Sequence, residues 1–124
     1  MKTIIVYRIE NRRREGMYAA SGAPGMDFYT FKEDINKQPH PGPYNDKELY
    51  FTFTKHYDNL FFGFGSLQQL KKWIGTPGFL EALIDKGYKI TKLRAKGKIS
   101  RFQAVYLKGT REYIATISLK RIRL

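Results

Sequence analysis

The sequence contains no cysteine and only two histidines. Without thiols the chain has no disulfide framework, no thiolate metal site and no thiol nucleophile, and two histidines, His40 and His56, do not make a histidine-rich metal site. No apolar run approaches the roughly 20 residues of a membrane-spanning helix, and the run at 4–7 is too short for a signal peptide. We therefore expect a cytoplasmic protein without a metal, a cofactor or membrane contact.

The composition is that of one folded domain. The 124 residues are 42% apolar and 15% aromatic, unlike the low hydrophobicity of disordered chains. A chain of this length buries on the order of two-thirds of the surface that it exposes when unfolded, which is enough for a modest core. We expect a single compact domain that spans residues 1–124.

Charge is distributed unevenly along the chain. The formal net charge is +12, yet residues 1–86 carry 12 Lys and Arg against 10 Asp and Glu, whereas residues 87–124 carry 11 against the single Glu112. Such a cluster creates a positive potential that attracts anions and that salt weakens. Basic residues also keep small β-rich proteins soluble, but solubility alone does not require so uneven a distribution. We expect a phosphate-rich or otherwise polyanionic partner.

The first half of the chain predicts strands and loops. Residues 3–9 are rich in β-branched and aromatic side chains and predict a strand. Three glycines and a proline at 16–25 predict a flexible loop, and the alternating prolines of 38–46 predict a rigid loop. Between them, the helical spacing of Phe28, Phe31 and Ile35 favours a short helix at 27–37, while residues 29–31 also suit a short strand. Residues 49–54 and 60–65 predict two further strands, joined by a turn at 57–59.

Two short helices are predicted in the middle of the chain. Ser66 is a good N-cap, and Gln69 three residues later completes a capping box for a helix that ends at Gly75. Thr76 and Pro77 then begin a second helix, which ends at Gly87. The inward faces of the two helices are Leu67, Leu70, Trp73 and Ile74, and Phe79, Leu80, Leu83 and Ile84.

The last third predicts an antiparallel meander. Its strands are 88–94, 99–107 and 112–119, and its turns are 95–98 and 108–111. Because the helices are grouped rather than alternating with strands, the fold class is α+β, with a mainly meander-type antiparallel sheet and two short central helices packed on one face.

Basic side chains occupy the solvent-facing positions and the turns of this meander. The candidate anion-binding residues are Lys89, Lys92, Arg94, Lys96, Lys98, Arg101, Lys108, Arg111, Lys120, Arg121 and Arg123, interleaved with Tyr88, Phe102, Tyr106 and Tyr113. Cations neutralise phosphates while an exposed aromatic ring stacks on a base, as in sheet-based binders of single strands. The alternative is that these aromatic residues belong to the core.

Arg12, Arg13 and Arg14 follow the first strand directly and are further candidates for phosphate binding. Three consecutive side chains cannot share one face, so at least one of them points to solvent. The run either clamps a phosphate or forms a solvated turn, and the sequence leaves both readings open.

A separate candidate pocket combines Tyr7, Arg8, His40, Ser66 and Gln103. Arg8 lies in an apolar strand, where an unpaired buried cation is costly, so an inward-facing Arg8 requires a carboxylate or a ligand as its partner. His40 stands among prolines, and a histidine can act near neutral pH as an acid, a base or a ligand donor, although a lone histidine in a loop is more often an ordinary loop residue.

Several segments together resemble a group of small, uncharacterised phage-encoded proteins. They are residues 6–10 (VYRIE), 40–43 (HPGP) with Asp46, 62–73 (FGFGSLQQLKKW) and 103–106 (QAVY). The resemblance spans most of the chain and implies a viral accessory protein, one that counters host defence or handles host nucleic acid in the host cytoplasm.

The order of elements also resembles the arginine, serine and glutamate plan of ADP-ribosyltransferases. In that plan Arg8 would correspond to the arginine that holds the NAD phosphate and Ser66 to the serine of the second motif. The late strand offers Gln103 where the catalytic glutamate is expected, and an amide cannot supply the negative charge that stabilises the transition state. The resemblance therefore implies a nucleotide binder rather than a transferase.

We expect a non-enzymatic binder of a phosphate-rich ligand, either a nucleic acid or a signalling nucleotide. The sequence contains no nucleophile elbow, P-loop, dinucleotide fingerprint or spaced carboxylate pair. Two alternatives stay open: an ADP-ribosyltransferase-like enzyme that uses NAD, and an inhibitor that docks its basic face on an acidic host protein.

Overall fold

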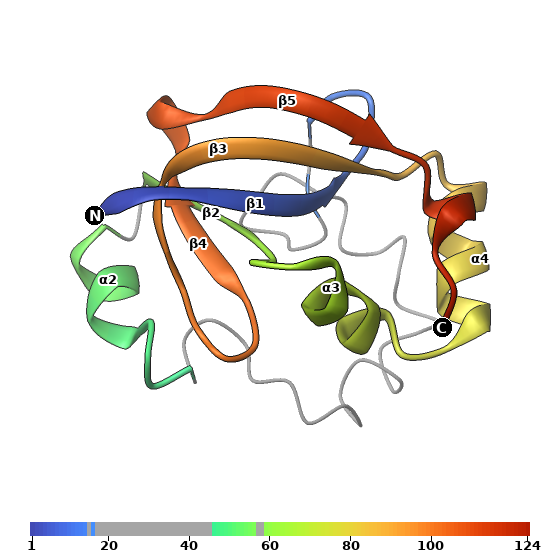
Figure 1. Ribbon diagram of the computed structural model, residues 1–124, viewed down its shortest axis with the longest axis horizontal. Helices are drawn as coiled ribbons and strands as arrows, with labels where there is room; N and C mark the ends of the chain where they lie inside the picture. The colour runs from blue at the N-terminus through green and yellow to red at the C-terminus, as the bar shows by residue number, and fades with distance from the viewer. Residues whose placement is uncertain (15, 17–45, 57–58) are drawn as a thin grey trace.

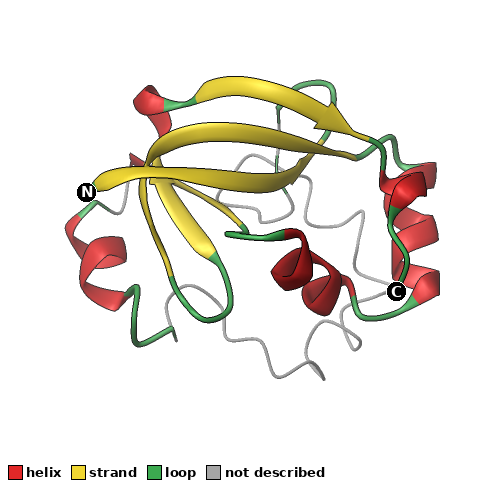
Figure 2. Ribbon diagram, in the orientation of Figure 1, coloured by secondary structure: helices red, strands yellow, loops and turns green. Residues whose placement is uncertain are grey.

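The computed structural model describes residues 1–14, 16, 46–56 and 59–124 (Figure 1). It is an α+β fold, which confirms the predicted class (Figure 2). The strands are β1 (Lys2–Glu10), β2 (Leu60–Gly63), β3 (Lys89–Ile99), β4 (Ala104–Leu107) and β5 (Glu112–Ile117), and the helices are α2 (Tyr50–Lys55), α3 (Leu67–Ile74), α4 (Pro77–Asp85) and the 3₁₀ turns η5 (Lys108–Thr110) and η6 (Leu119–Arg121). The predicted helix at 27–37, and most of the two predicted loops on either side of it, lie outside the described residues.

The long strand β3 organises the antiparallel sheet. β1 pairs with β3 from Lys2 opposite Gly97 to Glu10 opposite Lys89. The other edge of β3 is shared, because β5 pairs with its first half and β4 with its second half. β2 pairs with β4, and two hydrogen bonds of 2.8 Å between the backbones of Tyr7 and Phe64 bring the chain after β2 back to β1. The sheet therefore curls, with one concave face.

The predicted turn at 95–98 and the simple meander are wrong. β3 continues to Ile99, and β5 returns to pair with β3 rather than with β4. Gly97 suggested a turn, but its backbone lies so close to β4 that an added Cβ would collide with the Val105 carbonyl. This glycine therefore permits close packing of two strands rather than a reversal of the chain.

The predicted strand at 49–54 is also wrong, because residues 50–55 form helix α2. Leu49 is fully buried beside Leu60 and Val105, while Phe51 is 81% exposed. Thr54 donates its hydroxyl proton to the backbone carbonyls of Tyr50 and Phe51, at 3.0 and 3.1 Å. Burial at one end of the segment has overridden the β propensity of its aromatic and threonine side chains.

Helices α3 and α4 confirm the predicted capping signals. Ser66 accepts a hydrogen bond from the Gln69 backbone N–H at 3.1 Å, and Thr76 accepts one from Phe79 at 3.2 Å. The Gln69 side chain reaches one residue beyond the usual capping box and accepts from Gly65 N–H at 2.7 Å. Gly75 has a φ of 73° at the end of α3 and Gly87 a φ of 82° after α4, as their terminating positions require.

The two helices pack at one end of the sheet, on the face that carries Ile9 and Ile90 (Figure 1). Trp73 lies at the centre of this core, with its ring centroid 5.7 Å from that of Phe64 and 5.2 Å from that of Phe79. The concave face carries Val6 and Leu93, and then polar residues toward the end of β1. In the part of the chain that the structure describes, no helix is long and apolar enough to cross a membrane.

Candidate functional site

A tight turn follows β1 and presents the arginine run. The Arg14 N–H donates to the Asn11 carbonyl at 3.0 Å, and the Asn11 side-chain oxygen accepts from Arg13 N–H at 2.9 Å. Arg14 has a φ of 61°, a left-handed conformation that non-glycine residues seldom adopt. Arg12 and Arg14 line a pocket, whereas the exposed side chain of Arg13 does not. All three arginines are exposed, which agrees with the expectation that at least one points to solvent, while phosphate binding by this run stays a prediction.

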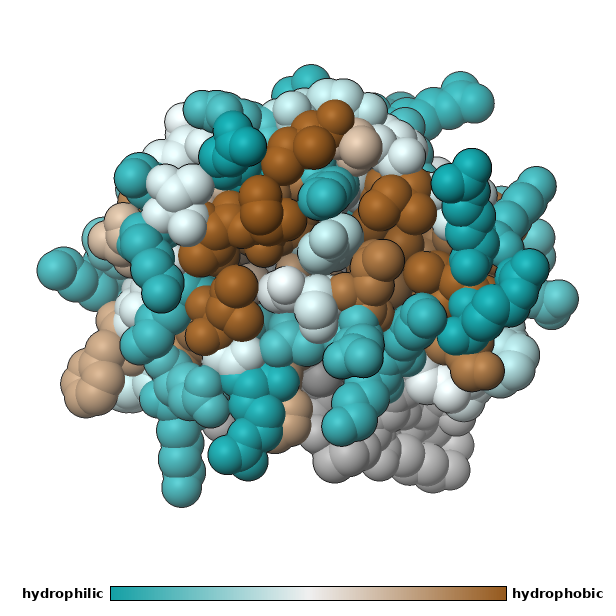
Figure 3. All heavy atoms as spheres, viewed as in Figure 1, coloured by the Kyte–Doolittle hydropathy of each residue, from teal (hydrophilic) through white to brown (hydrophobic). Residues whose placement is uncertain are grey.

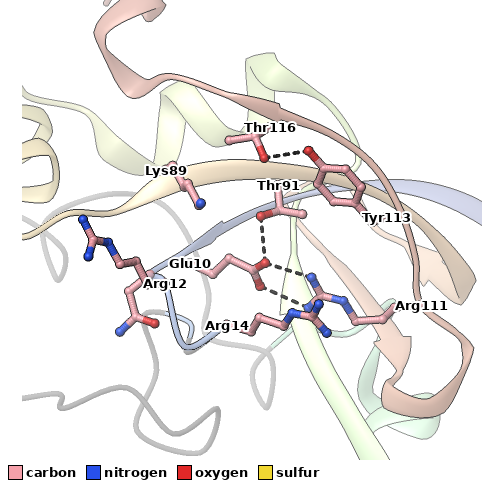
Figure 4. Close-up of a pocket in the computed structure, with 9 residues that line it drawn as sticks. Glu10, Arg12, Arg14, Lys89, Thr91, Arg111, Tyr113 and Thr116 are labelled. Carbon is pink, nitrogen blue, oxygen red and sulfur yellow. Dashed lines mark hydrogen bonds and ion pairs between the residues drawn. The ribbon is translucent and has the colours of Figure 1, made fainter.

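This pocket, which we call the Glu10 pocket, has a volume of about 500 Å³. It forms where the turn after β1, the start of β3 and the edge strand β5 meet (Figure 4). Its lining residues are Glu10, Asn11, Arg12, Arg14, Lys89, Thr91, Arg111, Tyr113 and Thr116. Four cationic side chains therefore surround a single carboxylate in the part of the lining that the structure describes.

Every oxygen of the Glu10 carboxylate is engaged. Arg111 binds it in bidentate fashion, with Nη2 2.8 Å from Oε1 and Nη1 3.1 Å from Oε2. Thr91 donates its hydroxyl proton to Oε1 at 2.7 Å, and Arg8 Nε donates to Oε2 at 3.1 Å. Four hydrogen bonds and two guanidinium charges thus compensate one buried carboxylate.

Arg8 lies beneath the Glu10 pocket with a relative exposure of 1%. Its Nη1 donates to the Phe62 carbonyl at 2.7 Å, and its guanidinium carbon stacks 4.4 Å from the centroid of the Phe61 ring. Its Nη2 has no hydrogen-bond partner among the described residues and packs against Gly16. The predicted need for a carboxylate partner is confirmed by Glu10.

The network fixes the protonation states of its members. Burial acts to raise the pKa of Glu10, but hydrogen bonds from Arg111 and Thr91 and the charges of both arginines outweigh it and hold that pKa below its usual 4.5. The hydrogen bond to Glu10 raises the pKa of Arg111, and burial raises the pKa of the nearby Tyr106 phenol. At neutral pH the network is one carboxylate between two guanidinium groups.

The remaining cations of the Glu10 pocket are available to a ligand. Among the described residues, Arg12, Arg14 and Lys89 form no ion pair. In the view of Figure 4, Arg12 and Lys89 lie to one side of Glu10, and Arg111 and Tyr113 lie to the other. The pocket therefore carries an excess of positive charge over most of its length.

Four other predicted residues form a row on the opposite face of β3, which we call the outer row. Lys92, Arg94, Lys96 and Lys98 alternate with the buried Leu93, Ala95 and Gly97. The Lys92 ammonium lies 5.8 Å from the centroid of the Tyr7 ring, and Arg94 pairs with Glu112 at 3.5 Å in an exposed contact. Figure 3 shows hydrophobic side chains exposed among hydrophilic ones across the strands.

The remaining predicted cations lie elsewhere. Arg101 and Arg123 join Lys71 and Lys72 around a second hollow of about 710 Å³, which we call the α3 hollow. Lys108 stacks its ammonium 4.7 Å from the centroid of Phe61, and Lys120 and Arg121 are exposed on η6. The predicted basic residues thus do not share one surface: most of them belong to the Glu10 pocket, the outer row or the α3 hollow, and Arg13, Lys108, Lys120 and Arg121 belong to none of the three.

The separate candidate pocket does not assemble from the residues that the structure describes. Arg8 belongs to the Glu10 network, Ser66 caps α3, and the buried Gln103 donates to Asp46 at 3.1 Å. Tyr7 is half-buried on the face opposite to Arg8, next to Lys92. His40 lies outside the described residues, so its place in a pocket stays a prediction.

Sequence reasoning missed the uncharged members of the Glu10 pocket and the place of Glu10 itself. Asn11, Thr91 and Thr116 carry no local signal of a site, because they are ordinary residues of a turn and of strands. The predicted alternative that aromatic residues of the basic region are core holds for Tyr88 and Tyr106, which are buried, whereas Tyr113 is 63% exposed.

Among the described residues, no group of three or more His, Asp and Glu side chains is suited to hold a metal ion.

These features define a small α+β protein with a curled antiparallel sheet and a cationic pocket at the ends of its strands. The chain belongs to the Bacteriophage T4 Y00F protein family, whose model matches residues 1–120. The predicted resemblance to small phage proteins is thereby confirmed, whereas the similarity to ADP-ribosyltransferases is not shown. Searches of curated proteins and of solved structures found no significant match.

Proposed function

We propose that the protein binds a phosphate-bearing ligand in the Glu10 pocket. The observation that carries the proposal is the state of Glu10, the only carboxylate in the lining among the residues that the structure describes: it is already saturated by Arg8, Thr91 and Arg111. Its charge is compensated inside the protein, so it offers little repulsion to an incoming anion. Arg12, Arg14 and Lys89 then supply cations that have no internal partner among the described residues.

The chemistry of these groups suits phosphate oxygens. Guanidinium groups donate two parallel hydrogen bonds to a phosphate, and a lysine adds a compact charge. Arg111 is held in place by Glu10, so it is oriented before a ligand arrives. Preorganised donors lose less entropy on binding than free side chains do.

The proposal is for a binding protein rather than an enzyme. In the described part of the chain Glu10 is the only carboxylate that lines the pocket, and its lowered pKa and four hydrogen bonds keep it ionised and engaged, which does not suit proton transfer. In a phage protein, such a pocket fits an accessory function in which a host nucleotide or nucleic acid is held, including one used in defence.

Calorimetric titration with inorganic pyrophosphate tests the proposal. The Arg12→Ala/Lys89→Ala variant removes two pocket cations, and Lys96→Ala/Lys98→Ala removes the same charge from the outer row. Because a hydrogen bond to a charged group contributes about 1.5–3 kcal/mol, we expect the pocket variant to bind at least about tenfold more weakly. The outer-row variant should bind within about twofold of the wild type. Equal weakening in both variants would show that only net charge matters and would contradict the proposal.

A second candidate function rests on the outer row. Its cations occupy every second residue of one strand and are therefore about 6.6 Å apart, comparable with neighbouring phosphates of an extended single strand. We propose a single-stranded nucleic acid as the partner of this surface, with exposed apolar side chains of the sheet beside it. An acidic host protein is the competing partner, and because it carries no condensed counterion atmosphere its affinity would fall less steeply with salt than that of a nucleic acid.

A further inference from the structure

We infer that the ligand of the Glu10 pocket is a nucleotide whose base stacks on Tyr113 while its phosphates contact the cations. This inference rests on the proposed function and adds the aromatic part of the ligand. The pocket volume of about 500 Å³ lies in the range of about 300–1,000 Å³ that is usual for sites of small organic molecules. A single inorganic phosphate, with five heavy atoms, would leave most of that space to water.

Tyr113 reaches the pocket because of an irregularity in β5. Tyr113 pairs with Leu93 and Ala115 pairs with Lys92, so one extra residue, Ile114, is inserted between them. Residues three apart on a regular strand face opposite sides of a sheet. The bulge places both Tyr113 and Thr116 on the pocket side, and both line the pocket.

The Tyr113 ring is exposed and yet held in position. Its side chain is 63% exposed, and its hydroxyl lies 2.9 Å from Thr116 Oγ1. A large aromatic ring gains little stability in that position, because most of its surface stays in water. An oriented, accessible ring beside cations is the arrangement that nucleotide-binding proteins use to stack a base next to its phosphates.

The geometry of the pocket sets the direction of the ligand. Tyr113 and the Arg12 and Lys89 pair lie on opposite sides of Glu10 in the view of Figure 4. A base on Tyr113 therefore directs the phosphates past Arg111 toward Arg12 and Lys89. An elongated molecule with a planar end and an anionic end matches this arrangement, and a compact anion uses only one side of it.

Calorimetric titration with inorganic pyrophosphate and with the four common ribonucleoside diphosphates tests the inference. We expect at least one nucleotide to bind about tenfold more tightly than pyrophosphate, the gain that stacking of one base provides. Tyr113→Ala should abolish this gain and leave pyrophosphate binding within about twofold, while Tyr113→Phe should retain it. Tyr50→Ala, which removes an exposed tyrosine on α2 outside the pocket, is the matched control.

The outcomes separate the two proposals. Pyrophosphate binding with no gain from any nucleotide, or a gain that survives Tyr113→Ala, overturns the inference and leaves the proposed function standing. No binding of either probe overturns both. Tighter binding of a 5′-phosphorylated trinucleotide than of every free nucleotide contradicts the assignment to free nucleotides. The ligand of the pocket would then be the 5′ end of a nucleic acid strand.

Discussion

Arg111 and Glu10 are 101 positions apart in the chain, and they form a bidentate ion pair with distances of 2.8 and 3.1 Å. The pair joins the end of the first strand to the turn that precedes β5. It neutralises the pocket carboxylate and orients the Arg111 guanidinium. The stability of the fold and the charge of the pocket therefore depend on the same contact.

Replacing Glu10 with glutamine should destabilise the protein strongly. Arg8 and Glu10 are 1% and 3% exposed, and the loss of one partner leaves a buried cation without its counter-charge. Such a loss typically costs about 3–5 kcal/mol, which urea denaturation would measure as a lower midpoint. Glu112→Gln is the matched control, since its pair with Arg94 is exposed and should contribute less than about 1 kcal/mol. Equal losses of unfolding free energy in the two variants would show that the buried network stabilises the protein no more than an exposed ion pair does.

The stability of the protein should fall in acid because of Glu10. Its pKa in the folded state lies below the ordinary value of 4.5, so the unfolded state takes up a proton first as the pH decreases. The contribution of Glu10 is fully present above 4.5 and is lost as the pH falls through the folded-state pKa. Urea denaturation from about pH 7 to about pH 3 should show a steeper loss for the wild type than for Glu10→Gln. Parallel curves of unfolding free energy against pH for the two proteins would contradict the lowered pKa of Glu10.

Gly16→Ala should destabilise the protein through Arg8. A Cβ at position 16 would overlap the Arg8 guanidinium, which is fixed by Glu10 and by the Phe62 carbonyl. Forcing an extra methyl group into packed space typically costs about 1–3 kcal/mol. Gly109→Ala is the control, because no atom lies within 4 Å of its added Cβ, and it should stay within about 0.5 kcal/mol of the wild type. Thermal denaturation of both variants measures the two changes in stability.

Salt dependence distinguishes the Glu10 pocket from the outer row. Binding of a single strand releases counterions, and its affinity falls with salt with a log–log slope of about −0.7 for each phosphate neutralised. If a single-stranded nucleic acid lies along the outer row, the Lys96→Ala/Lys98→Ala variant should have a salt slope that is shallower by about 1.4. The Arg12→Ala/Lys89→Ala variant should leave the slope for a single strand unchanged. Fluorescence anisotropy with a labelled oligonucleotide at several salt concentrations provides the measurement, and an unchanged slope in the Lys96→Ala/Lys98→Ala variant would exclude the second candidate function.

Elements with local signals were predictable from the sequence. The capping residues Ser66 and Thr76 and the terminators Gly75 and Gly87 act within a few residues of themselves, so α3 and α4 were predicted correctly. Helix α2 was not predictable, since burial of Leu49 by Leu60 and Val105 is a contact between distant parts of the chain. Gly97 was misinterpreted for the same reason, because the strand that approaches it follows later in the sequence.

The cationic residues of the candidate site were predicted from the sequence, but the way in which they come together was not. Arg12, Arg14, Lys89 and Arg111 were all expected to bind anions, and the structure places them around one pocket. Strand alternation separates Lys89 from the outer row, but the sequence does not show that Lys89 meets Arg12, Arg14 and Arg111, because that assembly follows from the pairing of β3 with β1 and β5. The contribution of Tyr113 depends on the bulge at Ile114, which pairing with β3 defines.

The central claim is that the Glu10 pocket is the anion site, and a crystal structure of the protein grown with tungstate tests it most directly. Tungstate is an electron-dense analogue of phosphate, so its anomalous signal locates the ion without prior assumptions. We expect a peak within hydrogen-bond distance of Arg111 together with Arg12 or Lys89. Peaks confined to the α3 hollow or to the outer row, with none in the Glu10 pocket, would contradict it.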